Sequence, residues 1–189
     1  MTSVVLAVLL FLSLSLNVWH ALVLNDIRSR SAASSPLAVG THLEPLVASD
    51  LDGRQVVVDF AATEVPTVLY VFSPQCVWCE RNVENIRELA AQVKGRYRFV
   101  ALSTSSQSIA EYVRVRQFDF DVLINPSASV VKTYRLGPTP QTLVVAPGGR
   151  LTQNWQGAYA DDMKGRIEQF FALQLPGLQE QDMQWNSPK

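Results

Sequence analysis

Both cysteines of this 189-residue chain lie in one short motif, Cys76-Val77-Trp78-Cys79. The motif follows an apolar run and opens a stretch with helical spacing, so Cys76 is expected at a helix N-terminus. Unpaired backbone N–H groups and the helix dipole stabilise an anion there. The pKa of the Cys76 thiol should therefore fall below the free value of about 8.5. We expect Cys76 to attack a substrate disulfide and Cys79 to resolve the resulting mixed disulfide.

Two other uses of a C-x-x-C pair are less well supported. A zinc site would need further ligands, but the chain has no second pair, and its two histidines, His20 and His42, both precede the motif at a distance. An inert structural disulfide would close so short a loop that it would constrain little of the unfolded chain. Redox chemistry at the two sulfurs is the favoured interpretation, with no metal and no cofactor.

The segments around the motif alternate between strand and helix patterns. Val65 to Phe72 is an apolar, β-branched run that predicts a buried strand, and residues 80–93 show helical spacing. The turn Asp52-Gly53 between apolar runs predicts a hairpin. Further strands are expected at 97–102, 122–124, 143–145 and 151–156, and further helices at 108–118, 128–134 and 161–173. This alternation predicts an α/β sandwich with a central mixed sheet.

Several segments resemble the thioredoxin superfamily in order and spacing. Residues 70–79 read Tyr-Val-Phe-Ser-Pro-Gln-Cys-Val-Trp-Cys, like the family's active-site segment, and residues 137–145 resemble its cis-proline segment. Residues 146–151 resemble the hairpin that follows. Residues 40–46 and 50–54 resemble the extra N-terminal hairpin of the TlpA-like, membrane-tethered branch. The resemblance covers roughly residues 40–173.

The resemblance implies a thioredoxin-like three-layer sandwich with an N-terminal hairpin extension, and a thiol–disulfide oxidoreductase. It implies a redox-active disulfide between Cys76 and Cys79 and a cis peptide bond before Pro140. The implied partners are protein thiols and disulfides, such as a transmembrane thiol donor or an apocytochrome, in cytochrome c maturation or extracytoplasmic disulfide reduction. The residues expected to line the site are Gln75, Val77, Trp78, Thr139 and Pro140.

The chain departs from the family pattern at three positions near the cysteines. Gln75 stands where the family commonly has Trp. Asn82 and Tyr70 stand where the family commonly has acidic residues, which removes two proton acceptors for Cys79. Glu80 is adjacent to Cys79 in sequence, but neighbouring helical residues do not share a face. The redox potential and the efficiency of thiol exchange are therefore left open.

The N-terminal segment predicts a membrane anchor. Residues 4–24 contain no charged side chain and, as a helix, would span about 31 Å, close to a bilayer core of about 30 Å. A cleaved signal peptide, cut near residues 31–34, and a buried core helix are the alternatives. The chain then divides into an anchor or uncleaved signal at 1–24, a tether at 25–39, a thioredoxin-like domain at 40–174 and a flexible tail at 175–189.

The net charge of the chain indicates which partners to expect, and the N-terminal segment indicates where the protein is located. The chain carries 16 Lys and Arg against 17 Asp and Glu, a net charge of −1, which argues against a nucleic-acid binder. The resemblance implies a single-pass protein of the bacterial inner membrane with a periplasmic catalytic domain. The first basic residues, Arg28 and Arg30, follow the apolar segment, and the positive-inside rule would place them in the cytoplasm. The orientation therefore stays open.

Two other functions compete with disulfide exchange. A peroxiredoxin-like peroxide reductase would have antioxidant activity, but it needs a Pro-x-x-x-Thr/Ser-x-x-Cys setting and a supporting arginine. Ser73-Pro74 does not give that spacing, and Arg81 is a weak substitute. A non-enzymatic binding module with a thioredoxin fold would not need its cysteines.

Overall fold

The computed structural model describes residues 13, 16–20, 22 and 36–178. The chain divides into two units, residues 1–35 and 36–189, and the second unit holds the sheet and the cysteines. Most of the predicted anchor at 4–24 and most of the predicted tether at 25–39 lie outside the described residues. Within the described part of the chain, we find no helix long and apolar enough to cross a membrane.

A five-stranded mixed sheet forms the centre of the second unit, in the order β5-β4-β3-β6-β7. Strands β3, β4 and β5 are parallel, whereas β6 is antiparallel to β3 and β7 is antiparallel to β6. The sheet confirms the predicted α/β class with a mixed sheet. Its strands are β3 (Thr67–Phe72), β4 (Arg98–Ser103), β5 (Asp121–Leu123), β6 (Gln141–Val145) and β7 (Leu151–Gln156).

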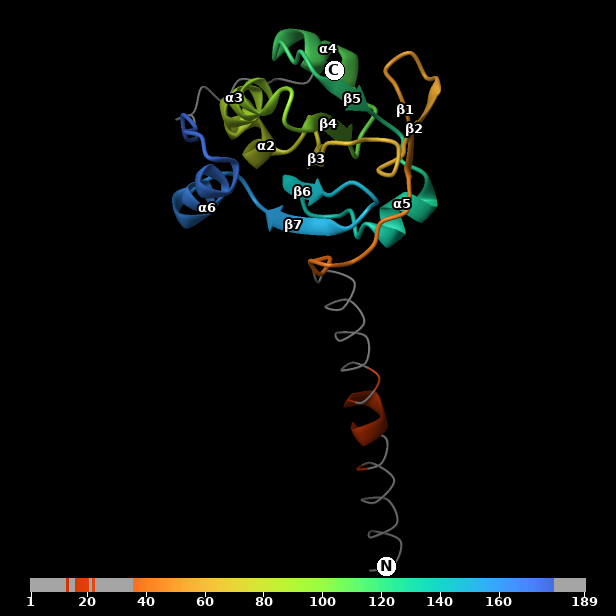
Figure 1. The fold of residues 1–189 in the computed structure, drawn as a ribbon. Helices are drawn as coiled ribbons and strands as arrows, with labels where there is room; N and C mark the ends of the chain where they lie inside the picture. The colour runs from red at the N-terminus through yellow and green to blue at the C-terminus, as the bar shows by residue number, and fades with distance from the viewer. Residues whose placement is uncertain (1–12, 14–15, 21, 23–35, 179–189) are drawn as a thin grey trace, which may run out of the picture. The chain divides into compact units, whose positions relative to one another are not determined.

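Layers cover both faces of this sheet, as Figure 1 shows. On one face lie α2 (Val77–Arg81), α3 (Val83–Val93), α4 (Ile109–Val115) and α6 (Asp161–Phe171). On the other lie α5 (Ala128–Thr133) and the hairpin of β1 (Leu46–Ser49) and β2 (Gln55–Val58). Every residue of β3 is buried because its side chains alternate between the two layers. Val68, Tyr70 and Phe72 face the α3 side, and Leu69 and Val71 face the hairpin.

The predicted helix over residues 80–93 is two helices that meet at Asn82. The expected apolar face is present, since Val83, Ile86, Leu89 and Val93 are all buried on the sheet. At Asn82, however, the backbone N–H turns back to the carbonyl of Cys79 at 3.1 Å, a tighter step than an α-helical bond. The break divides the short helix that carries the cysteines from the long helix that packs on the sheet.

Packing extends beyond the expected domain limits of 40 and 174. Leu37 is buried, and its carbonyl accepts a hydrogen bond from Asn154 Nδ2 at 2.8 Å. Leu175 is also buried, and the backbone N–H of Gly177 donates to Asn85 Oδ1 at 2.8 Å. The remainder of the predicted tail, residues 179–189, lies outside the described residues.

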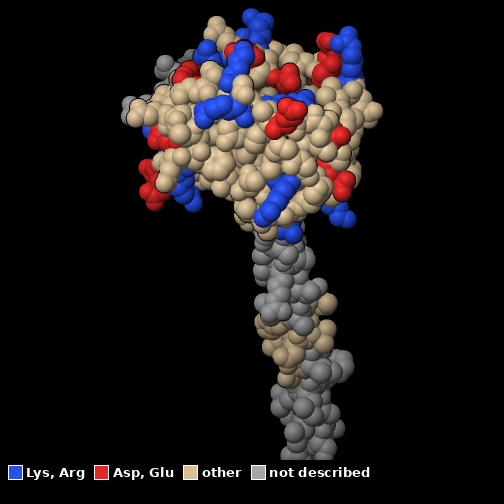
Figure 2. Space-filling view, viewed as in Figure 1, with Lys and Arg blue, Asp and Glu red and all other residues tan. Residues whose placement is uncertain are grey.

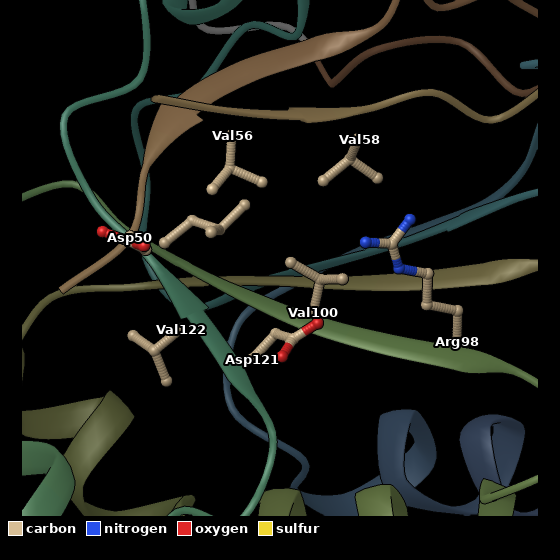
Figure 3. Close-up of a pocket in the computed structure, with 8 residues that line it drawn as sticks. Asp50, Val56, Val58, Arg98, Val100, Asp121 and Val122 are labelled. Atoms are coloured by element: carbon tan, nitrogen blue, oxygen red, sulfur yellow. The ribbon is translucent and has the colours of Figure 1, made fainter. Parts of the chain in front are cut away.

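A cavity of about 280 Å³ lies between the hairpin and strands β4 and β5 (Figure 3). Its walls are mainly valine, with Asp50, Arg98 and Asp121 among the lining residues. Arg98 pairs with Thr67 at the start of β3, whereas the cysteines follow the end of β3. The cavity therefore extends from the start of β4 along β5, and neither cysteine lines it. Lys, Arg, Asp and Glu are interspersed on the face of this unit shown in Figure 2.

Candidate active site

Cys76 caps the N-terminus of α2, as the sequence predicts. Strand β3 ends at Phe72, and a turn closes when the Cys76 N–H donates to the carbonyl of Ser73 at 3.1 Å. Cys76 has extended backbone angles, with φ −86° and ψ 112°. Its sulfur accepts a hydrogen bond from the backbone N–H of Cys79 at 3.1 Å. The sulfur thus occupies the place that a side-chain oxygen takes at many helix N-caps, where it meets unpaired backbone donors.

The pairing of β3 with β6 brings Thr139 and Pro140 to the cysteines. Val71 is the register partner of Gln141, so the residues just before β6 lie beside the turn that follows β3. The Thr139–Pro140 peptide bond is cis, as the resemblance implies. When it is protonated, the Cys76 thiol donates to the carbonyl oxygen of Thr139 at 3.4 Å. Two segments 63 residues apart therefore meet at one sulfur.

The two thiols are in different environments. Both cysteines are free; Cys76 is partly exposed and Cys79 is 2% exposed. A hydrogen bond from the Cys79 side chain lowers the pKa of Cys76 to about 6, with the backbone N–H groups of Cys79 and Trp78 acting in the same direction. Burial raises the pKa of Cys79, and its hydrogen bond to Cys76 raises it further. At neutral pH the accessible sulfur is the anion, and the buried one keeps its proton.

The other predicted lining residues surround Cys76. Val77 and Trp78 are large apolar side chains about half exposed, at 50% and 52%. The guanidinium of Arg81 lies 4.8 Å from the centre of the Trp78 ring, a cation–π arrangement. The Gln75 amide accepts from the Ser73 hydroxyl at 2.8 Å and donates to the Gln107 carbonyl at 3.4 Å. Apolar surface therefore adjoins the reactive sulfur.

Asn82 organises a buried polar layer under the cysteines that sequence reasoning did not foresee. Its Oδ1 atom accepts hydrogen bonds from the backbone N–H of Tyr159 at 3.1 Å and from Asn85 Nδ2 at 2.9 Å. Asn82 and Asn85 are both fully buried. The available signal was an amide at a position where helical periodicity expects an apolar residue, but its partners lie on distant segments.

The Glu80 side chain is directed at Arg116 and not at Cys79. Its Oε1 atom forms an ion pair with Arg116 Nη2 at 2.5 Å, and both side chains are about three-quarters buried, with 23% of Glu80 and 27% of Arg116 exposed.

The described part of the chain contains no group of three or more His, Cys, Asp or Glu side chains placed to hold a metal ion.

A comparison with protein families decides the assignment. The sequence pattern of the AhpC/TSA family matches residues 39–154. The chain belongs to the AhpC/TSA family. This AhpC/TSA domain spans the hairpin, the C-x-x-C pair, the cis-proline segment and most of β7.

Two relatives named as thiol-disulfide oxidoreductases match most of this chain. This AhpC/TSA protein is 25% identical over 144 residues to the thiol-disulfide oxidoreductase ResA of Bacillus thuringiensis subsp. konkukian, covering 74% of this chain and 80% of ResA. ResA of Bacillus cereus matches at the same identity and coverage. Together with the paired thiols, these matches confirm the predicted enzyme class, a thiol–disulfide oxidoreductase of the C-x-x-C type.

Solved structures confirm the thioredoxin-like fold. The thioredoxin domain of a thiol-disulfide oxidoreductase from Bacteroides vulgatus superposes with a TM-score of 0.58 at 17% identity, over 71% of this chain and 99% of that one. A secreted Mycobacterium tuberculosis disulfide oxidoreductase, described as homologous to E. coli DsbE, superposes with a TM-score of 0.53 at 19% identity. That match covers 67% of this chain and 93% of the other.

Proposed function

We propose that this protein is a membrane-anchored enzyme that exchanges a dithiol for a disulfide with protein partners. The observation that supports this most strongly is the set of hydrogen bonds at Cys76 Sγ. The sulfur accepts from the Cys79 N–H and lies 3.4 Å from the Thr139 carbonyl, and its pKa is lowered to about 6. A thiolate at this position is a ready nucleophile for a disulfide.

The proposed reaction uses the two sulfurs in turn. Cys76 thiolate attacks a partner disulfide, and one partner sulfur leaves as a thiolate while the other remains bound to Cys76. Cys79 then attacks Cys76 Sγ, which releases the second partner sulfur and closes the Cys76–Cys79 disulfide. Two electrons pass to the partner, and a separate thiol donor must return the pair to the dithiol.

Protein partners suit the surroundings of Cys76 better than small disulfides alone. We assign the half-exposed Val77 and Trp78 to partner contact, since exposed aromatic side chains are frequent anchors of interfaces. The backbone of Thr139 would pair with an extended partner segment as an added strand. Gln75 and Pro140 complete the lining of this proposed binding surface.

We propose a location for the enzyme on the basis of its N-terminal segment. The uncharged residues 4–24 are long enough for a single-pass anchor, and residues 25–35 would link it to the folded unit. We place the anchor in a bacterial inner membrane with the catalytic domain in the periplasm, where protein disulfides form and persist. A transmembrane thiol donor and an apocytochrome are the partners of this proposal, with a role in cytochrome c maturation.

Reduction of insulin tests the activity. The full-length protein in detergent, supplied with dithiothreitol, should precipitate the insulin B chain faster than dithiothreitol alone. Cys76→Ser should abolish the acceleration, and Val57→Ala, which changes an exposed apolar residue of the hairpin, should leave it intact. An inactive wild type, or full activity in Cys76→Ser, would contradict the proposal.

Two further measurements separate the alternatives. Consumption of hydrogen peroxide by the dithiol protein, at a rate comparable with disulfide exchange, would favour a peroxide reductase. Retained cellular function when both cysteines are changed to serine would favour a non-enzymatic binding module.

A labelling experiment tests the proposed location. A membrane-impermeant maleimide should label Cys76 in spheroplasts without lysis. Labelling only after lysis would place the domain in the cytoplasm.

A further inference from the structure

The ion pair between Glu80 and Arg116 joins the cysteine helix to α4. Glu80 Oε1 and Arg116 Nη2 are 2.5 Å apart, and about three-quarters of each side chain is buried. Glu80 belongs to α2, and Arg116 is the C-cap of α4. Separating such a pair would leave two poorly hydrated charges, which is unfavourable. The contact therefore restricts how far α2 can move from α4.

Tyr112 makes α4 a firm support for this contact. Its side chain is 1% exposed, and its ring centre is 5.8 Å from the ring of Phe72, the last residue of β3. The backbone N–H of Arg116 donates to the Tyr112 carbonyl at 2.9 Å. Burial raises the pKa of Tyr112, and the charge of Glu80 and a side-chain hydrogen bond to Glu80 raise it further. The ion pair is therefore continuous with the aromatic core at the end of β3.

Helix α2 needs such an anchor because it is short and ends at a break. It has five residues, and its C-cap is Asn82, where the chain turns before α3 begins. A helix of this length gains little stability from its own hydrogen bonds. Cys79 is its buried residue, whereas Val77 and Trp78 are half exposed. The contacts of Cys79 and Glu80 with the body of the domain therefore help to fix its position.

Glu80 also lies close to the reactive sulfur. It is four residues after Cys76, and its backbone N–H donates to the Cys76 carbonyl at 3.0 Å, so the two residues are one helical turn apart. A lone carboxylate at that separation would oppose a thiolate at Cys76. The Arg116 guanidinium supplies an equal and opposite charge at 2.5 Å. The pair thus brings no net charge to the turn that holds the thiolate.

We propose that Glu80 and Arg116 are positioning residues for disulfide exchange, because their ion pair anchors α2 to α4 without placing a net charge beside the Cys76 thiolate. The inference rests on the proposed function, since it concerns the sulfur that starts the exchange. Both residues act through α2. They hold the backbone donors of the helix N-terminus in place and leave their effect on the thiolate unopposed.

The other titratable groups near α2 do not interfere with a test of these two charges. Arg81 lies on α2 itself and is the same in every variant below. At the start of α3, Glu84 is already paired with Arg87 at 3.1 Å. Burial raises the pKa of each tyrosine in the surrounding core, so these side chains stay neutral below pH 9. They are Tyr70 of β3, Tyr112 of α4 and Tyr159, which follows β7.

Three variants separate the two charges. For each full-length dithiol protein in detergent, the rate of Cys76 alkylation by iodoacetamide is measured from about pH 4 to pH 9. Arg116→Gln leaves the carboxylate alone and should raise the midpoint by about 0.5–1 pH unit. Glu80→Gln leaves the guanidinium alone and should lower it by a similar amount, and the double variant should return close to the wild-type value. Shifts in the same direction in both single variants, or none, would overturn the inference.

Lys164→Gln is the matched control for Arg116→Gln. Lys164 pairs with Glu168 at 2.8 Å within α6, and the two side chains are 30% and 22% exposed, close to the values for Arg116 and Glu80. This variant also leaves a carboxylate without its cation, so it should lower the unfolding temperature. It should move the Cys76 midpoint by less than about 0.2 pH unit. A shift as large as that of Arg116→Gln would overturn the inference.

A comparison of Glu80→Ala with Glu80→Gln isolates the anchoring role. Both remove the negative charge, but only glutamine keeps an oxygen that can accept from Arg116. At pH 8.5 the Cys76 thiolate is fully formed in both, so the release of the first thiolate from dithiobis(nitrobenzoate) reports position and not titration. Glu80→Ala should be about threefold slower than Glu80→Gln. Equal rates would show that α2 needs no anchor and would overturn the inference.

Failure of the proposed function would look different. A wild type that does not reduce insulin would overturn that function. The alkylation and aromatic-disulfide measurements need no protein partner, so they would still decide whether Glu80 and Arg116 position Cys76.

Discussion

The backbone N–H of Cys79 donates a hydrogen bond to the sulfur of Cys76 at 3.1 Å. This bond links the two cysteines through the first turn of α2, where Cys76 occupies the N-cap. The bond helps to stabilise the Cys76 sulfur as an acceptor, while burial of Cys79 keeps the proton on the second sulfur. The division of labour between an attacking and a resolving thiol therefore depends on the helix N-terminus at Cys76 and on the burial of Cys79.

Alkylation of Cys76 should follow a low-pH titration. Since the thiolate is the reactive form and the pKa of Cys76 is lowered to about 6, the rate with iodoacetamide should be half-maximal near pH 6. The rate is measured from about pH 4 to pH 9, with mass spectrometry to identify the modified residue. A midpoint near 8.5, as for an ordinary thiol, would contradict the assigned environment.

Cys79→Ala should raise the midpoint of that titration. The side-chain hydrogen bond from Cys79 is the largest cause of the lowered pKa of Cys76. Losing a hydrogen bond to a charged sulfur should move the midpoint upward by about 1–2 pH units. Cys79→Ser, which keeps a donor, is the matched control and should move it less. Midpoints unchanged from the wild type in both variants would mean that the backbone donors alone are responsible.

Stability of the dithiol protein should depend on pH through Cys76. Its pKa when folded, about 6, lies below the unfolded value of about 8.5, so the thiolate favours folding. This contribution is complete above about pH 8.5 and is lost as the pH falls through about 6. Because Cys76 is partly exposed, solvent screening reduces it. Urea unfolding should show the wild type gaining stability over Cys76→Ala between pH 6 and 8.5; a constant difference would refute this.

Trp78→Ala should impair protein substrates selectively. Trp78 is half exposed, so its removal should change the free energy of unfolding by only about 0.5–1 kcal/mol. If the indole anchors partners, KM for insulin should rise about tenfold while the rate with a small aromatic disulfide is unchanged. Val57→Ala removes exposed apolar surface elsewhere and should alter neither. Equal losses with both substrates would place Trp78 in the chemistry rather than in binding.

The local patterns of the sequence predicted most of the fold. The apolar run that ends at Phe72 had to be a buried strand, and period-two alternation distributes its side chains between two layers. The turn at Asp52-Gly53 and the apolar face of α3 were equally local signals. The break at Asn82 was hidden because the helical spacing continues on both sides of it.

The polar layer beneath the cysteines could not be predicted, because its partners come from distant segments. Asn82 bonds to the backbone of Tyr159, and Asn85 bonds to Gly177 near the end of the described chain. Similarly, the contact between Cys76 and Thr139 depends on the register of β3 with β6. The sequence alone indicated Thr139 and Pro140 only through the family resemblance.

The most direct test of the central claim is to trap the mixed disulfide and map it by mass spectrometry. The full-length variants Cys79→Ser and Cys76→Ser are each incubated with native insulin, in which disulfide bonds join the two chains. Cys79→Ser should accumulate a covalent adduct joined through Cys76, and Cys76→Ser should form essentially none. An adduct on Cys79 of Cys76→Ser at a comparable rate, or no adduct on Cys76, would contradict the assignment of Cys76 as the attacking thiol.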